Sequence, residues 1–432
     1  MLPFLTSQES RMRRNAANWL DLAAKVWNFR RDLLGEAEAA ELTARRDDLQ
    51  NRLRDRADAG KLKLGIEALE GVLRRTGGSV YPKTSLGENV EFFLVAALVI
   101  LAIRTYFVQP FKIPTNSMWP TYYGMTAENL PPGAAVPGKL GQAFRLLAFG
   151  AQRKLVTAPK SGEVSAQFFQ NGALACTVKS ARSWLVFPTQ VREYTFLVDG
   201  APAVVQVPLD FDEFDKVFRE TYFGGDEGFY RFLEQQAHEG RMEGSWIRAS
   251  DASGDMVHTV TLRLSRTVRQ GDPILRFDLM TGDQLFVDRL SFHFMRPVVG
   301  QAFVFRTDHI PGIGKEDYYI KRLVGVPGDV MEVRSPALYR NGRPITGARA
   351  FELEASRTPP YPGYTYGDTL PNGIYLARGS TLTVPPHSYF AMGDNSPLSA
   401  DGRVWGFVPA KDAVGRPLFI YYPFTRRWGP AR

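Results

Sequence analysis

The sequence predicts a mainly β core of antiparallel sheets, with an α+β insertion, one membrane-spanning helix and a helical N-terminal extension. Three observations predict this organisation. Residues 15–75 are rich in Ala, Leu, Arg and Glu, which favour helices; one long apolar run covers residues 90–108; and alternating apolar and polar residues recur beyond residue 124. The chain has 432 residues, 44% of them hydrophobic, so it can bury more than one core.

These observations predict four regions. We expect a helical cytoplasmic extension over residues 1–85 and a transmembrane helix over residues 86–108. A β domain would combine residues 109–124 with residues 281–432, and residues 125–280 would form an α+β insertion of unknown role.

The charge balance bears on the choice of partner. The net charge of +8 and the pI of about 9.4 favour an anionic partner. There is no dense basic run of the kind found in nucleic-acid-binding arms, so lipid headgroups are expected rather than nucleic acid. A single cysteine, Cys176, excludes an intramolecular disulfide, and the opening residues lack the features of a cleavable signal peptide.

The N-terminal extension has apolar residues at helical spacing. Six apolar residues follow one another at spacings of mostly three and four, which places them on one face of a helix: Trp19, Leu22, Val26, Phe29, Leu33 and Leu34. A second helical stretch contains Leu42, Leu49, Leu53, Ile66, Leu69 and Leu73. With breaks at Gly60 and at Gly77-Gly78, the pattern predicts a helical hairpin or a short coiled coil. Two interpretations agree with this pattern: the helices pack against one another, or they form a basic amphipathic helix that lies on a membrane surface.

The apolar run extends from Val90 to Val108, with Glu91 near its start and Arg104 near its end. A spanning helix needs about 20 mainly apolar residues, so this run is just long enough. A buried core helix is the alternative. An interfacial aromatic belt at the far end favours the span: Tyr106, Phe107, Phe111, Trp119, Tyr122 and Tyr123. Arg74, Arg75 and Lys83 before the span slightly favour a cytoplasmic N-terminus.

The insertion has recognisable strands and helices. VREYTFLVDGAPAVVQV predicts two strands around an Asp199-Gly200 turn, and MVHTVTLRLSRTV predicts another strand. Residues 211–238 look helical, with a break at Gly224-Gly225. Residues 133–140, GAAVPGKL, have the glycine and lysine spacing of a phosphate-binding loop. Leu140 lacks the hydroxyl that would hold Mg²⁺ and no buried strand precedes it, so we do not expect nucleotide binding.

A candidate nucleophile follows the apolar run directly. Pro110, Pro114 and Pro120 prevent a continuing helix and favour extended geometry before each proline. We therefore expect residues 116–118, which include Ser117, to form a stiff, strand-like segment. A serine hydroxyl needs a base to take its proton, so this interpretation depends on finding a base elsewhere in the chain.

A lysine in a later strand is a candidate for that base. In DYYIKRLV, strand alternation places Lys321 on the same face as Tyr319 and Leu323. Apolar surroundings disfavour the charged ammonium, so a lysine held there would have a lowered pKa and could accept a proton. Taken alone, a lysine in a strand is most often a surface residue. The chain then turns at Asn341-Gly342 in a second predicted hairpin.

The string GDNSPLSADGRVWGFVP is the most distinctive in the chain. Glycines surround four polar residues of this string: Asp394, Asn395, Asp401 and Arg403. We interpret the string as a buried structural loop in which the charges of these residues are paired with one another. Ser399 differs from these residues, because its small hydroxyl could orient a neutral lysine by hydrogen bonding.

Together these strings resemble the type I signal peptidases. TNSMWPT, GQAFVFR, DYYIKRLVGVPGD and GDNSPLSADGRVWGFVP resemble four sequence boxes of that family, in the family's order and behind a membrane anchor. The resemblance covers roughly residues 90–124 and 282–432. It implies a signal-peptidase-like β fold for the core and says nothing about the insertion or the N-terminal helices.

The resemblance implies a role for each matching residue. Ser117 matches the nucleophile and Lys321 the general base of a Ser/Lys dyad. The hydroxyl of Thr115 and the backbone N–H of Ser117 match the oxyanion hole, and Ser399 matches the serine that orients the lysine. Asn116 departs from the small residue common at its position, and Ser396-Pro397-Leu398 depart from the usual polar run.

The family's activity is also implied. By resemblance the chain is a serine endopeptidase that removes signal peptides from secretory preproteins after small residues, in an A-x-A-like site, without metal or cofactor. It would be a single-pass protein of the cytoplasmic (inner) membrane, with a cytoplasmic N-terminus and its catalytic domain on the outer face. The lipid bilayer would then be a partner; the sequence does not specify an oligomeric state.

Three rival interpretations differ in what they require. Self-cleaving repressors share a Ser/Lys dyad, but need a DNA-binding head and no membrane span. A catalytically inactive membrane scaffold would lose the dyad, whereas both Ser117 and Lys321 are present. A Ser-His-Asp hydrolase would need a GxSxG elbow or an equivalent, which Ser117 lacks.

Overall fold

The protein was analysed as a computed structural model. It describes residues 8–81, 85–131, 136–169, 171–183, 187–241, 246–250, 256–314 and 317–431. The opening residues 1–7, Lys83 and the start of the GAAVPGKL stretch therefore lie outside the described residues. The chain divides into two compact units, residues 1–101 and 102–432, which we treat separately.

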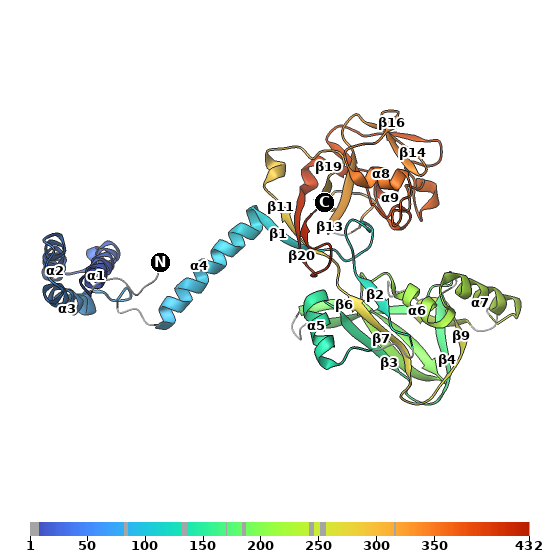
Figure 1. Cartoon of the computed structure of the whole chain (residues 1–432), viewed down its shortest axis with the longest axis horizontal. Coiled ribbons are helices and arrows are strands. Elements are labelled where there is room, and N and C mark those ends of the chain that lie inside the picture. Colours follow the sequence, from blue (N-terminus) through green and yellow to red (C-terminus); the bar gives the residue numbers. More distant parts are fainter. Residues whose placement is uncertain are drawn as a thin grey trace. The chain divides into compact units, whose positions relative to one another are not determined.

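The first unit is a bundle of three helices, α1 (Gln8–Arg30), α2 (Glu36–Arg54) and α3 (Ala59–Thr76), with a short 3₁₀ turn η2 (Arg31–Leu33) (Figure 1). Each helix has an apolar stripe, and the stripes form one shared core. The buried members of that core are Ala16, Ala23, Val26, Leu42, Leu49, Leu62, Ile66, Leu69, Val72 and Leu73. The apolar residues of these helices thus pack against one another.

Two details of the predicted N-terminal helices are wrong. Phe29 and Leu33 are 75% and 73% exposed, so neither belongs to the buried face of the bundle; Leu33 lies beyond α1, which ends at Arg30. Gly60 does not break a helix but lies in the first turn of α3. That helix begins after Asp58, whose side chain accepts a hydrogen bond from the Lys61 backbone N–H.

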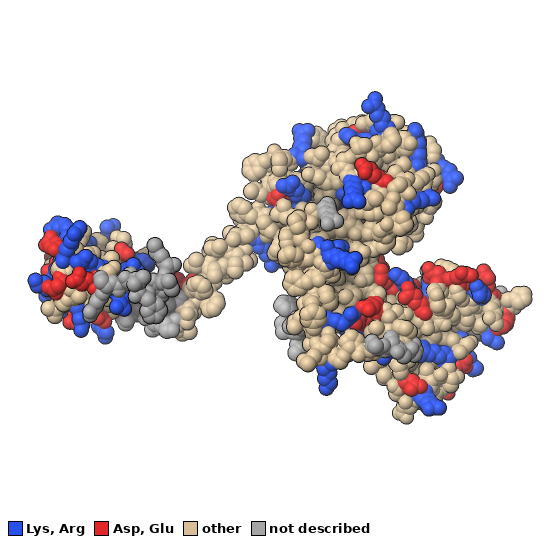
Figure 2. Space-filling view, viewed as in Figure 1, with Lys and Arg blue, Asp and Glu red and all other residues tan. Residues whose placement is uncertain are grey.

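Helix α4 (Ser85–Tyr106) contains the apolar run and ends before the first predicted proline. Its residues Asn89–Tyr106 are long and apolar enough to cross a membrane, and none of this window is buried. This exposure differs from that of a buried core helix. Figure 1 shows α4 as one continuous helix, and its visible surface in Figure 2 is mostly free of charged residues.

The second unit contains an eight-stranded sheet in the order β1-β11-β20-β12-β13-β18-β19, with β21 beside β20. Its strands are β1 (Val108–Lys112), β11 (Gln284–Asp288), β12 (Ala302–Arg306), β13 (Tyr318–Gly325), β18 (Ser388–Met392), β19 (Val408–Pro409), β20 (Ala413–Tyr422) and β21 (Gly429–Pro430). Every strand pairing in the described residues is antiparallel. The predicted mainly β, antiparallel core is therefore confirmed.

A smaller sheet follows in the order β16-β15-β14-β17. It consists of β14 (Val330–Arg334), β15 (Ala337–Arg340), β16 (Arg343–Pro344) and β17 (Thr381–Thr383), with helices α8 (Arg349–Ala355) and α9 (Gly402–Trp405) nearby in the sequence. Short 3₁₀ turns occur at Ser291–His293, Gly367–Thr369, Ser396–Leu398 and Ala410–Asp412. Asn341 and Gly342 both have positive φ, so the predicted turn between β15 and β16 is confirmed.

The insertion forms two further sheets, β2-β10-β3 and β5-β6-β4-β9-β8, with β7 beside β6. The strands are β2 (Thr126–Asn129), β3 (Gln152–Thr157), β4 (Gly162–Phe169), β5 (Cys176–Ser183), β6 (Phe187–Val198), β7 (Ala201–Pro208), β8 (Trp246–Ser250), β9 (Met256–Val268) and β10 (Pro273–Met280). The helices are α5 (Lys139–Phe149), α6 (Phe214–Phe223) and α7 (Asp226–His238).

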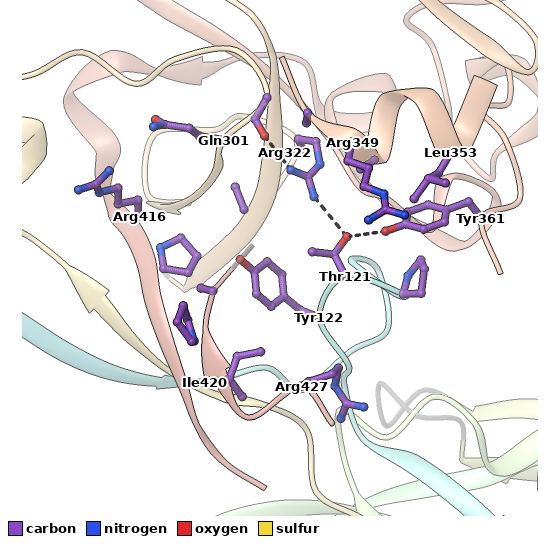
Figure 3. A pocket seen from close by; sticks show the side chains of 18 of the residues that line it. Thr121, Tyr122, Gln301, Arg322, Arg349, Leu353, Tyr361, Arg416, Ile420 and Arg427 are labelled. Carbon is purple, nitrogen blue, oxygen red and sulfur yellow. Dashed lines mark hydrogen bonds between the residues drawn. The ribbon is translucent and has the colours of Figure 1, made fainter. Parts of the chain in front are cut away.

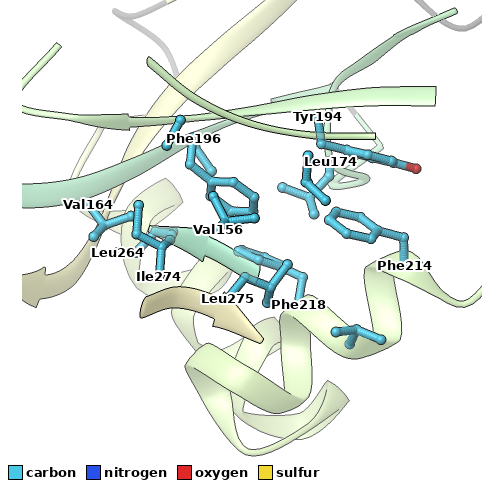
Figure 4. Close-up of a cluster of buried hydrophobic side chains, with 14 of the residues drawn as sticks. Val156, Val164, Leu174, Tyr194, Phe196, Phe214, Phe218, Leu264, Ile274 and Leu275 are labelled. Carbon is cyan, nitrogen blue, oxygen red and sulfur yellow. The ribbon is translucent and has the colours of Figure 1, made fainter. Parts of the chain in front are cut away.

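An aromatic core joins these sheets to α6. Figure 4 shows Phe214 and Phe218 of α6 among side chains from the strands, including Phe196. The rings of Tyr194 and Phe214 stack with centroids 4.0 Å apart. Cys176 is buried in this core.

Candidate active site

The candidate nucleophile lies in a turn. Residues 116–118 were predicted to be strand-like, and that prediction is wrong: the Trp119 N–H donates to the Asn116 carbonyl at 3.0 Å and the Tyr122 N–H to the Met118 carbonyl at 2.9 Å. The Met125 N–H closes the loop on the Pro114 carbonyl at 2.9 Å. The prolines stop β1 from continuing, and these local bonds then fold the chain back on itself.

Lys321 reaches this turn from the middle of the eight-stranded sheet. It lies on β13, which pairs with β12 on one side and β18 on the other. Its side-chain nitrogen Nζ is 2.5 Å from Ser117 Oγ, although the two residues are 204 positions apart in the chain. Lys321 is only 4% exposed, so the interpretation of this lysine as a surface residue does not apply.

The surroundings of Lys321 favour a neutral amine. Burial lowers the pKa of Lys321 to about 8, and Arg403 acts in the same direction, while Asp401 and Asp394 oppose the shift. With a pKa of about 8, roughly one amine in ten is unprotonated at pH 7. The lysine can therefore accept a proton from a neighbouring hydroxyl near neutral pH.

The loop that starts at Gly393 holds the turn from the other side. The backbone N–H of Asn395 donates to the Ser117 carbonyl at 3.1 Å, and Asn395 Nδ2 donates to the Asn116 carbonyl at 3.1 Å. A Cβ atom on Gly393 would lie 2.4 Å from the Ser117 carbonyl oxygen and 2.2 Å from Ser399 Oγ. Only glycine permits this close approach.

The charges of the loop are satisfied, with one partner that the sequence analysis missed. Arg403 and Asp401 are both fully buried and form a two-pronged ion pair. Asp394 does not pair with Arg403 but with Arg322, through bonds of 2.7 and 2.5 Å. Arg322 comes from β13, next to Lys321, and no local sequence signal indicated this contact.

A cavity of about 390 Å³ opens onto the serine and the lysine and is also lined by Thr115. Thr115 therefore lies at the same site as predicted, beside Ser117. Ser399 is 2% exposed, but its Oγ has no hydrogen-bond partner among the residues that the structure describes. The predicted bond from Ser399 to the lysine is thus not formed, and the hydrogen bond that Lys321 Nζ makes is with Ser117 Oγ.

The insertion also contacts the turn, through residues that the sequence analysis did not identify. Asn116 Nδ2 donates to Glu213 Oε1 at 3.1 Å and to the Met125 carbonyl at 3.0 Å, while Asn116 Oδ1 accepts from the Gly124 N–H at 3.0 Å. Glu213 Oε2 accepts from the Ala127 N–H at 3.1 Å. Glu213 directly precedes α6, so a carboxylate of the insertion fixes the residue before Ser117.

No metal centre accompanies this arrangement within the described part of the chain: it contains no group of three or more His, Cys, Asp or Glu residues that could hold an ion. The chemical groups at the site are a hydroxyl, a buried amine and hydrogen-bond donors.

Comparison with known proteins gives the family. Residues 275–422 match the family model described as "Signal peptidase, peptidase S26". A probable signal peptidase I-1 of Synechocystis is 33% identical over 154 residues, which cover 35% of this chain and 67% of that protein. The chain belongs to the signal peptidase family. Its members are serine endopeptidases, and this chain is one.

Two further relatives are also signal peptidases. A second Synechocystis protein, probable signal peptidase I-2, is 30% identical, covering 34% of this chain and 59% of the relative. Signal peptidase IB of Staphylococcus aureus is 28% identical, covering 36% of this chain and 74% of the relative. The chain thus spans between 59% and 74% of the length of these relatives.

A solved signal peptidase I from Enterococcus faecalis is 30% identical and covers 28% of this chain and 97% of that one, with a TM-score of 0.22. A TM-score this low supports no argument about the fold. The family model begins at residue 275, so it includes Lys321 and Ser399 but neither Thr115 nor Ser117.

Proposed function

We propose that this chain removes N-terminal signal peptides from secretory preproteins through a Ser117/Lys321 dyad. The single observation that supports this best is the 2.5 Å approach of a buried lysine amine to Ser117 Oγ. The membership in the signal peptidase family supports the same reaction. Neither the inactive scaffold nor the self-cleaving repressor is favoured, since the relatives are signal peptidases.

The proposed reaction has two halves. Neutral Lys321 takes the proton of Ser117 as Oγ bonds to the scissile carbonyl carbon, and the resulting ammonium gives that proton to the leaving amine nitrogen when the C–N bond breaks. In the second half, Lys321 takes a proton from a water molecule that attacks the acyl ester. The lysine then returns the proton to Ser117 Oγ, which restores the free enzyme.

The substrate is proposed to bind in extended form. β1 is an edge strand of its sheet, pairs with β11 alone among the strands of the described residues, and is followed two residues later by Thr115. A free strand edge offers backbone groups to an extended peptide, and Phe111 and Lys112 of β1 line the same cavity as Ser117 and Lys321. Cleavage after small residues, as in A-x-A, is proposed from the resemblance to the signal peptidases.

The test is direct cleavage. Detergent-solubilised full-length chain is incubated with a preprotein, and mass spectrometry locates the new N-terminus. We expect one cut after the A-x-A site and little cleavage when the final alanine is replaced by leucine. A random set of cuts, or none, would contradict the proposal.

Membrane placement follows the same proposal. α4 would anchor the chain in the cytoplasmic membrane as a single pass, with the N-terminal helices in the cytoplasm and the residues after α4 on the outer face. Secretory precursors emerge on that face. The proposed catalytic part is residues 109–124 with 281–432, and residues 125–280 form the insertion.

Thr115 is proposed to stabilise the oxyanion together with the Ser117 N–H. Replacing Thr115 by valine removes one donor while keeping the shape of the side chain, so kcat is expected to fall by about 100- to 1,000-fold. Thr115→Ser keeps the hydroxyl and serves as the matched control, with kcat expected within a few-fold of wild type. Equal rates for the valine and serine variants would remove Thr115 from this role.

The pH dependence of cleavage is expected to follow Lys321. Because the base must be unprotonated, kcat/KM should rise roughly tenfold per pH unit at low pH and level off above an apparent pKa of about 8. The profile is measured from about pH 6 to about pH 10 with a peptide that has no ionisable group beside the cleavage site. A flat profile, or an inflection at the ordinary lysine value, would contradict a buried neutral amine.

Glu213 is expected to affect the rate although it lies in the insertion. Glu213→Ala leaves Asn116 without one of its partners and loosens the residue before the nucleophile, so kcat is expected to fall by about 10- to 100-fold with little change in KM. Glu220→Ala is the matched control, because Glu220 is an exposed carboxylate on α6, the helix that Glu213 precedes. An unchanged kcat in Glu213→Ala would show that the insertion does not position the turn.

A further inference from the structure

The structure contains a second cavity, of about 800 Å³, whose lining is shown in Figure 3. Neighbouring residues of a strand point to opposite faces, so Lys321 of β13 lines the active-site cavity while Arg322 lines this one. The turn that contains Ser117 likewise contributes residues to both cavities. Ser117 faces the active site, and Thr121 and Tyr122 line the second cavity.

Arginines dominate the lining of this second cavity. Five of its described lining residues are arginines and none is Asp or Glu: Arg322, Arg349, Arg416, Arg426 and Arg427. We call this cavity the arginine pocket. The arginines come from β13, from α8, from β20 and from the segment after β20, so the fold, and not one basic stretch of sequence, brings them together.

Three of these arginines already have carboxylate partners outside the pocket lining. Arg322 pairs with Asp394 at 2.5 Å, Arg427 with Asp283 at 2.8 Å and Arg416 with Asp288 at 3.4 Å. The last of these pairs is long, and the Arg416 side chain is 41% exposed.

The positive charges of Arg349 and Arg426 are not neutralised by a carboxylate of the described residues. Within the described chain, neither Arg349 nor Arg426 has a carboxylate within ion-pair distance, and both are exposed. Two free guanidinium groups thus face one concave space that contains no negative side chain among its described lining residues. An anion placed there would be attracted by both.

A neutral donor completes the pocket. The hydroxyl of Tyr361 faces it, and its hydrogen bond with Thr121 Oγ1 is long at 3.4 Å, whereas Thr121 donates to Asp394 at 2.5 Å. The Tyr361 hydroxyl can therefore reorient toward a ligand in the pocket. Several guanidinium groups and a hydroxyl together offer many hydrogen-bond donors. A phosphate group, with three acceptor oxygens and up to two negative charges, uses these donors better than a carboxylate does.

We propose that the arginine pocket binds a phosphate group, held mainly by Arg349 and Arg426. The group can belong to a phospholipid headgroup or to a free phosphate compound, since both present the same oxygens. This site is separate from the dyad and does not depend on the proposed peptidase reaction. A bound phosphate would contact the rear of the strand and turn on which Lys321 and Ser117 lie.

The test is binding to the full-length chain in an uncharged detergent, measured by calorimetry at constant ionic strength. The probes are inorganic phosphate and a short-chain phosphatidic acid below its micelle concentration, with acetate as the anion control. The variants are Arg349→Ala/Arg426→Ala and a matched control, Arg343→Ala/Lys411→Ala, which removes two exposed cations that do not line the pocket.

We expect at least one phosphate probe to bind more tightly than acetate, and the Arg349→Ala/Arg426→Ala variant to lose about tenfold or more in affinity. The control should bind as wild type does. Equal affinity for both probes would assign the site to a free phosphate, and tighter binding of the phosphatidic acid would assign it to a lipid headgroup. Absence of binding by both probes, or equal affinity in the two double variants, would overturn the proposal.

The same titration on Ser117→Ala separates this inference from the peptidase reaction. That variant cannot cleave by the proposed mechanism but keeps the arginine pocket, so its phosphate affinity should equal that of wild type. A failure of the peptidase proposal would leave this result unchanged.

Discussion

Replacing Lys321 by methionine is expected to reduce kcat by about 10⁴- to 10⁶-fold, because members of a catalytic unit act together and the loss of one removes nearly all of its effect. Ser117→Ala should fall into the same range, and the double variant should be hardly slower than either single one. The measurement is single-turnover cleavage of a preprotein by full-length chain in detergent. Lys411→Ala, which removes an exposed lysine of the same unit, is the control.

Stability distinguishes a catalytic from a structural role for this lysine. Burial lowers the pKa of Lys321 to about 8 in the folded chain, below its value in the unfolded chain. Burying the charged lysine therefore lowers the free energy of unfolding. The full loss applies below about pH 8, becomes smaller as the pH rises from there to the unfolded pKa, and is absent above the unfolded pKa. Lys321→Met removes this cost, so its melting temperature at neutral pH should rise while activity is lost. Activity above one hundredth of wild type would remove the lysine from its proposed role.

Local chemistry explains what the sequence could predict. Asn341-Gly342 and Asp199-Gly200 adopt positive φ at the turns where their residue types favour it, and the strands on either side of each turn pair with one another. The apolar run forms one helix, and the Gly224-Gly225 pair separates α6 from α7. In each case the deciding interactions lie within a few residues of one another.

Long-range contacts explain what the sequence could not predict. Asp394 pairs with Arg322, which is 72 residues away, and Asn116 bonds to Glu213, which is 97 residues away. No spacing rule connects such positions, so the loop was expected to satisfy its own charges. The sequence left Lys321 open between a buried and a surface position, and strand alternation did not decide between them, because β13 is buried on both faces from Lys321 to Gly325. The turn at Ser117 likewise required bonds that no pattern of prolines specifies.

The buried pair of Asp401 and Arg403 is expected to have the largest effect on stability. Arg403 donates to both Asp401 oxygens, to the Thr365 carbonyl and to the Ser396 carbonyl, and both charged residues are fully buried. Arg403→Met would leave a carboxylate without its counter-charge and two carbonyls without donors. Breaking a buried pair in this way costs about 3 to 5 kcal/mol. The free energy of unfolding is measured by guanidinium titration with tryptophan fluorescence.

Arg334→Met is the matched control for that measurement. Arg334 also pairs with a carboxylate, Glu332, at 2.7 Å, but its side chain is 51% exposed, so the change should lower the free energy of unfolding much less than Arg403→Met does. The Arg403 variant should also lose activity, since Gly393 and Asn395 of the same loop hold the carbonyl of Ser117. If Arg403→Met were no more damaging than Arg334→Met, the loop would be held by its other contacts, and the position of the nucleophile would not depend on this buried charge.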